Sequence, residues 1–176
     1  STVASICLFA VTSKAKTIYV DDNASANGDG TSWASAHKYL QDALASAEYG
    51  DEIWVAEGVY KATDSTDPFE IIKSFNLKNG VVIKGGFLGN ETSPNPKGFA
   101  YDTILTGKVD FSLDYGSDYI RSPIILGELI IDKIILENLN ICHGRSNDDY
   151  LNNGGAVYLE KSEVLFKNCF FENNSA

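Results

Sequence analysis

The sequence predicts an all-β chain in which short parallel strands stack as a solenoid and one amphipathic helix covers the N-terminal end. Two observations lead to this fold class. Most apolar runs are short, rich in Ile, Val and Leu, and bounded by Gly, Asn and Asp, which is typical of strands. Several runs are apolar at consecutive positions and no helical segments separate them. Parallel strands without crossover helices leave mainly the β-solenoid.

The first fifty residues predict one strand, one loop and one helix. Residues 17–20 form a short apolar strand, and residues 21–31 form a polar loop rich in Gly, Asn and Asp. Ser32 is expected to cap a helix that Gly50 closes, and the helix is expected to cover the open apolar end of the first coil. Its apolar stripe, at i, i+3, i+4 and i+7 spacing, consists of Trp33, Ala36, Leu40, Ala43, Leu44 and Ala47.

Beyond this helix the sequence predicts only strands and turns, and parts of the pattern repeat. Residues 81–85 resemble residues 103–107, and residues 138–142 resemble residues 167–171, at intervals that fit a coil of three short strands. The strands are expected at residues 52–56, 59–60, 81–84, 103–106, 124–126, 129–136, 139–142, 156–159 and 164–167.

Asparagine is concentrated at the expected turns. Its short amide side chain tolerates left-handed backbone and, in stacked coils, is able to hydrogen-bond along a ladder. The residues assigned to such turns are Asn138, Asn140, Asn168, Asn173 and Asn174.

The charge balance excludes some classes of partner. The chain carries 14 basic and 24 acidic residues, a formal net charge of −10, and its basic residues form no cluster. A duplex or an anionic membrane surface would be repelled by this field. We therefore expect no nucleic-acid partner, and we expect an acidic surface that suits a protein outside the cell.

Residues 3–12 form a short apolar run that small residues and two lysines follow. This is typical of the apolar core and cleavage site of a signal peptide, and the run is too short to span a bilayer. A buried first strand is the alternative. We interpret residues 1–15 as a signal-peptide remnant and residues 16–176 as the cap and first coils of a solenoid truncated at its C-terminus. The expected location is secreted or at the cell surface, with no membrane span in the mature chain.

The three cysteines do not indicate a zinc site, because no CxxC spacing occurs. Cys7 lies in the presumed signal peptide. Cys142 and Cys169 each follow or fall within an apolar strand, so buried free thiols are the preferred interpretation. A disulfide between them is the alternative in an oxidising compartment.

Several blocks of the sequence, taken together, suggest a family. Residues 18–23 (IYVDDN), 30–33 (GTSW), 40–44 (LQDAL), 50–60 (GDEIWVAEGVY), 80–87 (GVVIKGGF), 89–92 (GNET) and 103–107 (TILTG) occur in order. They resemble the N-terminal module of pectate-lyase-like β-helix surface proteins. Residues 154–157 (GGAV) and 171–174 (FENN) resemble the GGA[ILV] and FxxN repeats of polymorphic outer membrane proteins. The resemblance implies a right-handed parallel β-helix with an N-terminal capping α-helix. Its implication for function is broader, since adhesins, autotransporter passengers and polysaccharide lyases share this scaffold.

The most ligand-like group is the acidic loop that contains Asp21, Asp22 and Asp29. Oxygen-rich loops of this kind bind Ca²⁺, but the spacing does not match the EF-hand loop. A loop of Asx turns without a metal is the preferred interpretation, and Ca²⁺ is the alternative. No other cofactor is expected.

Further candidates for ligand binding lie in polar segments. Aromatic side chains in such segments are candidates to stack on sugars, and loops that project from a rigid solenoid commonly carry binding specificity. The candidates are Tyr115, Tyr119, Tyr150, Asp148 and Asp149. Trp33 and Trp54 are assigned to core packing.

We expect no catalytic site in this sequence. A pectate-type lyase needs carboxylates that hold Ca²⁺ and a Lys or Arg that abstracts a proton, and no acidic cluster surrounds Lys133, Lys161 or Lys167. The leading hypothesis is an adhesin-like β-helix protein that binds polysaccharide or cell-surface glycan. The alternatives are part of a polysaccharide lyase whose site lies downstream, and a structural spacer. The further coils of its own solenoid are the remaining expected partner.

Overall fold

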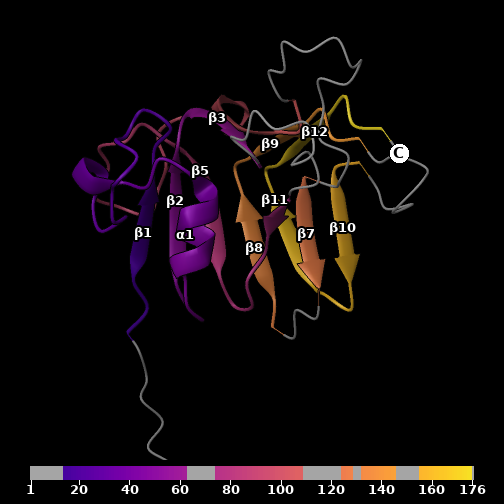
Figure 1. Cartoon of the computed structure of the whole chain (residues 1–176), viewed down its shortest axis with the longest axis horizontal. Helices are drawn as coiled ribbons and strands as arrows, with labels where there is room; N and C mark the ends of the chain where they lie inside the picture. Colours follow the sequence, from indigo (N-terminus) through magenta and orange to yellow (C-terminus); the bar gives the residue numbers. More distant parts are fainter. Residues whose placement is uncertain (1–13, 63–73, 109–123, 129–131, 146–154, 176) are drawn as a thin grey trace, which may run out of the picture.

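A computed structural model describes residues 14–62, 74–108, 124–128, 132–145 and 155–175 of the chain (Figure 1). These residues are mostly β. The strands are β1 (Thr17–Val20), β2 (Glu52–Ala56), β3 (Gly58–Lys61), β4 (Phe75–Asn76), β5 (Val82–Phe87), β6 (Thr103–Thr106), β7 (Ile125–Glu128), β8 (Ile134–Glu137), β9 (Asn140–Cys142), β10 (Val157–Glu160), β11 (Val164–Lys167) and β12 (Phe170–Glu172). Strands β4 and β12 were not predicted.

The strands form three parallel sheets that the chain visits in rotation. A five-stranded sheet has the order β1-β2-β5-β8-β11, a four-stranded sheet β3-β6-β9-β12, and a three-stranded sheet β4-β7-β10. After β1, the chain runs from the five-stranded to the four-stranded to the three-stranded sheet, and then repeats this circuit. All strand pairs are parallel, which confirms the prediction of parallel strands.

The main core lies between the three sheets. In the five-stranded sheet, register places one inward row of apolar side chains in line across all five strands. The row consists of Ile18, Ile53, Ile83, Leu136 and Phe166. The first four belong to one buried apolar cluster with side chains from the other two sheets, and Phe166 packs against this cluster. Side chains alternate between the two faces of a strand, so the intervening residues point outward. Apolar positions along each strand therefore both close the core and fix the register.

Register also shows how the circuits repeat. Ile134 pairs with Val164 and Asn140 pairs with Phe170, so these two circuits are 30 residues apart. The predicted match of residues 138–142 with 167–171 is therefore wrong by one residue. The match of residues 81–85 with 103–107 is also wrong, because these segments belong to β5 and β6 in different sheets. Both errors arose because similar short apolar runs occur in strands of more than one sheet.

The asparagine turns are confirmed at three of the five predicted positions. Asn138, Asn168 and Asn173 have φ angles of 55°, 49° and 53°. The Asn168 amide donates to Asn138 Oδ1 at 3.3 Å, which forms one step of the expected ladder. The prediction is wrong for Asn140, which lies within β9, and for Asn174, which has no left-handed backbone. The Asn174 side chain bonds the backbone of the previous circuit instead, accepting from Gly144 N and donating to Ile141 O.

The predicted helix is shorter than its apolar stripe. A 3₁₀ turn covers η1 (Trp33–Ser35), and α1 covers Leu40–Ser46. Between them the backbone is extended, because His37 forms a parallel bridge with Val20 and its N–H donates to Tyr19 O. The expected N-cap is wrong, since Tyr39 occupies that position and Ser32 makes no capping bond to the 3₁₀ turn. Backbone pairing with β1 overrides the helical periodicity here.

Helix α1 packs against strands at the N-terminal side of the parallel sheets. Its buried residues Leu40, Ala43 and Leu44 join the main core, and the helix contacts β1, β2 and β4. Strand β4 is the edge of the three-stranded sheet, so the helix lies beside an edge that would otherwise be open. This agrees with the expected covering role.

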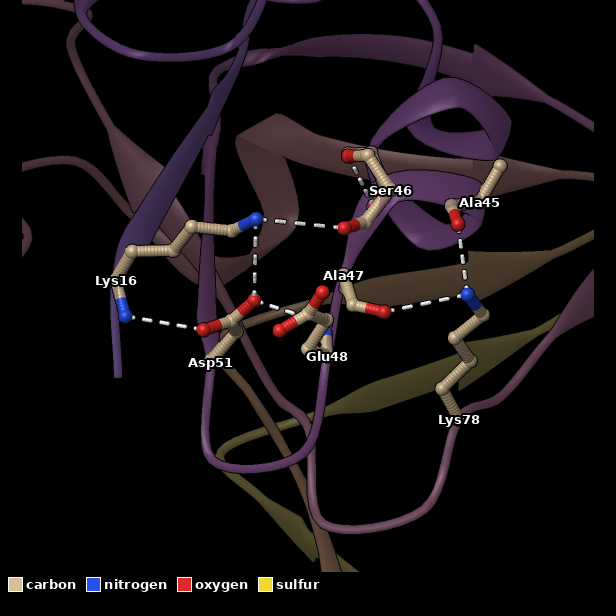
Figure 2. A network of polar contacts seen from close by, with 8 residues as sticks. Lys16, Ala45, Ser46, Ala47, Glu48, Asp51 and Lys78 are labelled. Carbon is tan, nitrogen blue, oxygen red and sulfur yellow. Dashed lines mark hydrogen bonds and ion pairs between the residues drawn. The ribbon is translucent and has the colours of Figure 1, made fainter. Parts of the chain in front are cut away.

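Two lysines from other parts of the chain bind backbone carbonyls at the C-terminal end of this helix (Figure 2). Lys78 Nζ donates to the carbonyls of Ala45 at 2.7 Å and Ala47 at 3.2 Å, and Lys16 Nζ lies 3.5 Å from the Ser46 carbonyl. Cations suit a helix C-terminus because its carbonyls carry partial negative charge. Helix α1 therefore ends at Ser46 with Ala47 as its C-cap, and the expected closure by Gly50 is wrong.

Asp51 connects the same region to the start of β1. It is 2% exposed, and its carboxylate accepts from Lys16 N at 3.0 Å and Glu48 N at 2.8 Å. Lys16 Nζ lies 3.7 Å from Asp51 Oδ2 (Figure 2). A buried carboxylate needs such donors to offset its loss of hydration.

A cluster of aromatic side chains, separate from the main core, covers the outer face of the five-stranded sheet. Trp54 stacks on Phe87 with ring centres 4.8 Å apart, and Tyr19 meets both Trp33 and Trp54 edge to face. Trp54 is buried as predicted, but in this outer cluster instead of the main core, and Trp33 is half-buried. The Trp33 indole N–H donates to the carbonyl of Glu91.

The remaining difference concerns the strand predicted over residues 129–136. Residues 132 and 133 lie outside strands, and β8 begins at Ile134.

Within the described residues, no helix has the length and apolar character that crossing a membrane requires.

Candidate functional site

The outer face of the four-stranded sheet carries a groove across β3, β6 and β9. Register places Val59 beside Ile104 in one row, and Lys61, Thr106 and Cys142 in line across the three strands in the next row. The inward row of the same sheet is Tyr60, Leu105 and Ile141, which belongs to the core. The groove residues are therefore the outward half of three strands, and strand alternation positions them.

The groove has a volume of about 490 Å³ and is lined mainly by apolar atoms. Val59 and Ile104 form its floor. Lys61 lies on β3, and Lys108 follows β6 by two residues. The full lining is Val59, Lys61, Ile104, Thr106, Lys108, Cys142 and His143. Its volume is within the usual range of small-molecule sites, and both full charges in the lining are positive.

A thiol and an imidazole meet in this groove. Cys142 Sγ lies 3.1 Å from His143 Nδ1, and Thr106 Oγ1 lies 3.4 Å from the same nitrogen. Thr106 Oγ1 also accepts a hydrogen bond from Lys108 N at 3.1 Å. Burial raises the pKa of the Cys142 thiol, although a hydrogen bond with Thr106 lowers it in part.

Backbone geometry brings these two neighbours together. Successive side chains of a strand point to opposite faces, so Cys142 and His143 would diverge if β9 continued. His143 instead has a φ of 62°, in the left-handed region that non-glycine residues rarely adopt. This conformation ends the alternation and places both side chains in one groove.

A smaller cavity of about 200 Å³ adjoins the groove and shares Val59 and Lys61 with it. Its lining also includes Asp22, Lys38 and Tyr60. The Tyr60 hydroxyl donates to Ala56 O and accepts from Asp22 N. Burial strongly raises the pKa of Tyr60, so this hydroxyl stays protonated.

The predicted acidic loop forms local turns. Asp21 accepts from Asn23 N, and Asp22 accepts from the Asn23 amide and from Val59 N at 2.9 Å. Asp29 accepts from both the backbone N–H and the hydroxyl of Thr31, and these bonds lower its pKa from 3.8 to about 2. Within the described ranges, no group of three or more His, Cys, Asp or Glu side chains is placed to hold a metal ion. Asp21 and Asp29 each accept from the backbone N–H two residues ahead, as in an Asx turn, whereas Asp22 accepts from Val59 on β3.

The other predicted site residues lie outside the described residues. They are Tyr115, Tyr119, Asp148, Asp149 and Tyr150. The structure therefore tests none of them.

The lysines considered for lyase chemistry are at the surface. Lys133 pairs with Glu163 at 3.6 Å, and Lys161 pairs with Glu160 at 3.5 Å. Lys167 is exposed at the end of β11. None of the three lines the groove.

Sequence reasoning missed the groove because its residues are far apart in the chain. The equivalent positions of β3 and β6 are 45 residues apart, and those of β6 and β9 are 36 apart. A signal was present in the outward positions of β3 and β6, which combine an apolar residue with Lys61 in one strand and Thr106 in the other. No family model, curated protein or solved structure matches this chain.

Proposed function

We propose that this chain belongs to a secreted or surface-displayed right-handed parallel β-helix protein of adhesin type that binds glycans. The rotation of the chain through three parallel sheets supports the β-helix, because each circuit then adds one strand to each face. The right-handed sense follows the general preference of parallel crossover connections. The resemblance of residues 18–107 to pectate-lyase-like surface proteins supports the same assignment.

The observation that carries the binding function is the groove on the four-stranded sheet. It offers an apolar floor, hydroxyl and imidazole groups, and two ammonium groups along the stacking direction. Adjacent strands of a sheet are about 4.8 Å apart, a spacing similar to the advance of one sugar unit in an extended polysaccharide. Sugars present apolar ring faces and hydroxyls, which match the floor and the polar rim.

The test is binding of the purified chain to immobilised neutral and acidic polysaccharides, with Ca²⁺ and with a chelator. The double variant Lys61→Gln/Lys108→Gln should weaken binding of an acidic polysaccharide by up to about thirtyfold, because each of the two ionic contacts contributes up to about 1 kcal/mol. The matched control Lys167→Gln removes a lysine from the outer face of a different sheet and should leave binding unchanged.

Two outcomes would contradict the proposal. Formation of unsaturated sugar products, followed by ultraviolet absorbance, would favour a polysaccharide lyase. Absence of binding to every polysaccharide would favour a structural spacer.

A further inference from the structure

Asp51 is a buried carboxylate whose hydrogen-bond donors, among the described residues, are both uncharged. It is 2% exposed, and its two oxygens accept from the backbone N–H groups of Lys16 at 3.0 Å and Glu48 at 2.8 Å (Figure 2). The Lys16 ammonium lies 3.7 Å from Asp51 Oδ2, beyond hydrogen-bond distance, and its side chain is 51% exposed. A charged donor in direct contact stabilises a buried carboxylate more than a neutral one does. A positive charge at the Lys16 backbone nitrogen would therefore suit Asp51.

The chain that follows this nitrogen holds it in place. The Lys16 carbonyl accepts from Glu52 N at 3.0 Å, and β1 begins at the next residue and pairs with β2 in register. Lys14 and Ala15, the described residues before Lys16, are exposed. The position of the Lys16 nitrogen against Asp51 is therefore set by residues on its C-terminal side, and it does not require the chain before it.

The sequence places a cleavage motif at the same peptide bond. The apolar run of residues 3–12 is followed by Ser13, Lys14 and Ala15. A signal peptidase reads small residues at the first and third positions before the bond that it cleaves, and Ala15 and Ser13 would occupy these two positions. The motif thus predicts a new N-terminus at Lys16, whose nitrogen contacts a buried carboxylate. Two independent observations indicate one bond.

We propose that cleavage of the Ala15–Lys16 peptide bond creates an α-ammonium group that pairs with Asp51 and fastens the mature N-terminus to the start of β2. Water adds across the bond and gives a carboxylate on Ala15 and an ammonium on Lys16, and a signal peptidase is the class of enzyme that catalyses this hydrolysis. The ammonium keeps the hydrogen bond to Asp51 and makes it charge-assisted. The inference rests on export of the chain, which is part of the proposed function.

The first experiment compares purified chains with defined first residues, so that its result depends neither on export nor on glycan binding. The mature chain (residues 16–176) and the extended chain (residues 15–176) differ by one exposed alanine, and both are compared with the whole chain. The mature chain should melt at least about 2 °C above the other two at pH 7, because only it carries an ammonium at the nitrogen that contacts Asp51. Asp51→Asn removes the carboxylate and should make the mature and extended chains melt at the same temperature.

The pH dependence keeps the proposal falsifiable if Asp51→Asn does not fold. An α-ammonium ordinarily loses its proton at about pH 8, and pairing with a carboxylate raises its pKa. Since the folded pKa is then above the unfolded one, the advantage of the mature chain should be complete below pH 8 and lost as the pH rises further. Both chains contain the other charged groups near this nitrogen, so their titration cancels in the comparison. These groups are the side chains of Lys16, Glu48, Asp51, Glu52 and Lys78.

A second experiment tests the cleavage itself. The whole chain is incubated with a purified signal peptidase in detergent micelles, and mass spectrometry of the product should show Lys16 as its first residue. Absence of cleavage or a different first residue would overturn the proposed processing. Equal melting temperatures of the mature and extended chains at pH 7 would overturn the pairing with Asp51. Failure of glycan binding would change neither result.

Discussion

Asn168 donates a side-chain hydrogen bond of 3.3 Å to Asn138, and both residues hold left-handed backbone at the same corner of successive circuits. The corner lies between the five-stranded and four-stranded sheets, where only two residues separate β8 from β9 and β11 from β12. Left-handed backbone makes this sharp turn, and asparagine tolerates it better than most residues with a side chain. The amide then ties one circuit to the next.

Replacement of Asn138 separates these two contributions. Asn138→Ala should lower the free energy of unfolding by about 1–2 kcal/mol, because alanine is strained at a φ of 55° and the side-chain hydrogen bond from Asn168 is lost. Asn138→Gly accepts the backbone and loses only the hydrogen bond, so its cost should be about 1 kcal/mol or less. Urea unfolding followed by circular dichroism measures both. Equal stability of the alanine and wild-type proteins would exclude a structural role for this turn.

Lys78 should contribute to stability through the end of α1. Its ammonium bonds two helix carbonyls, so Lys78→Met should lower the free energy of unfolding by about 0.5–1 kcal/mol. Lys14→Met is a control, because Lys14 is exposed and lies before β1. Thermal or urea unfolding of the two variants compares the same change of charge in two settings. A similar effect of both substitutions would show that net charge, not helix capping, is responsible.

Asp29 should titrate well below an ordinary aspartate. Hydrogen bonds from Thr31 favour the carboxylate and lower its pKa to about 2. Since the folded pKa is below the ordinary value of 3.8, the associated stabilisation is present above pH 3.8 and is lost as the pH falls toward 2. Thr31→Val removes the hydroxyl and should raise the Asp29 pKa toward 3.8. Carboxyl carbon chemical shifts in an NMR titration follow both proteins, and an unchanged pKa in the variant would contradict this assignment.

Local patterns were sufficient to predict much of the strand content. The bounds of β1, β6 and β11 agree with the predicted strands at residues 17–20, 103–106 and 164–167. The GGA motif also has a physical reason, since a Cβ added at Gly155 would lie 2.1 Å from the carbonyl oxygen of Ser175. The strand bounds depend on residues close in sequence, whereas the constraint on Gly155 comes from Ser175, which is distant in the chain.

Features that depend on the third dimension were not predictable in the same way. The apolar spacing from Trp33 to Ala47 does not reveal that His37 pairs with β1 and interrupts the helix. Circuit lengths of 45, 36 and 30 residues along the four-stranded sheet likewise hide the alignment of Lys61 with Cys142. Loops of different length separate these positions, so no fixed sequence interval indicates that they share a groove.

The last strands of the three sheets should make the isolated chain associate. Among the described residues, β10, β11 and β12 are each paired on one side only, and Phe170 and Phe171 are 48% and 47% exposed. Open strand edges beside apolar side chains promote pairing between molecules. We therefore expect the apparent mass in light scattering to rise with protein concentration.

A charge on the exposed edge tests this origin of association. Phe170→Lys places a cation on the outward face of β12, in the same row as Val59, where edge lysines oppose strand pairing, and should shift the protein toward the monomer. Val59→Lys is a matched control on β3, the opposite edge strand of the same sheet, where Val59 is 48% exposed. If association arises at the β10–β12 edge, the control should associate like the wild type. A wild-type chain that stays monomeric and unfolds cooperatively at high concentration would show that these edges do not pair.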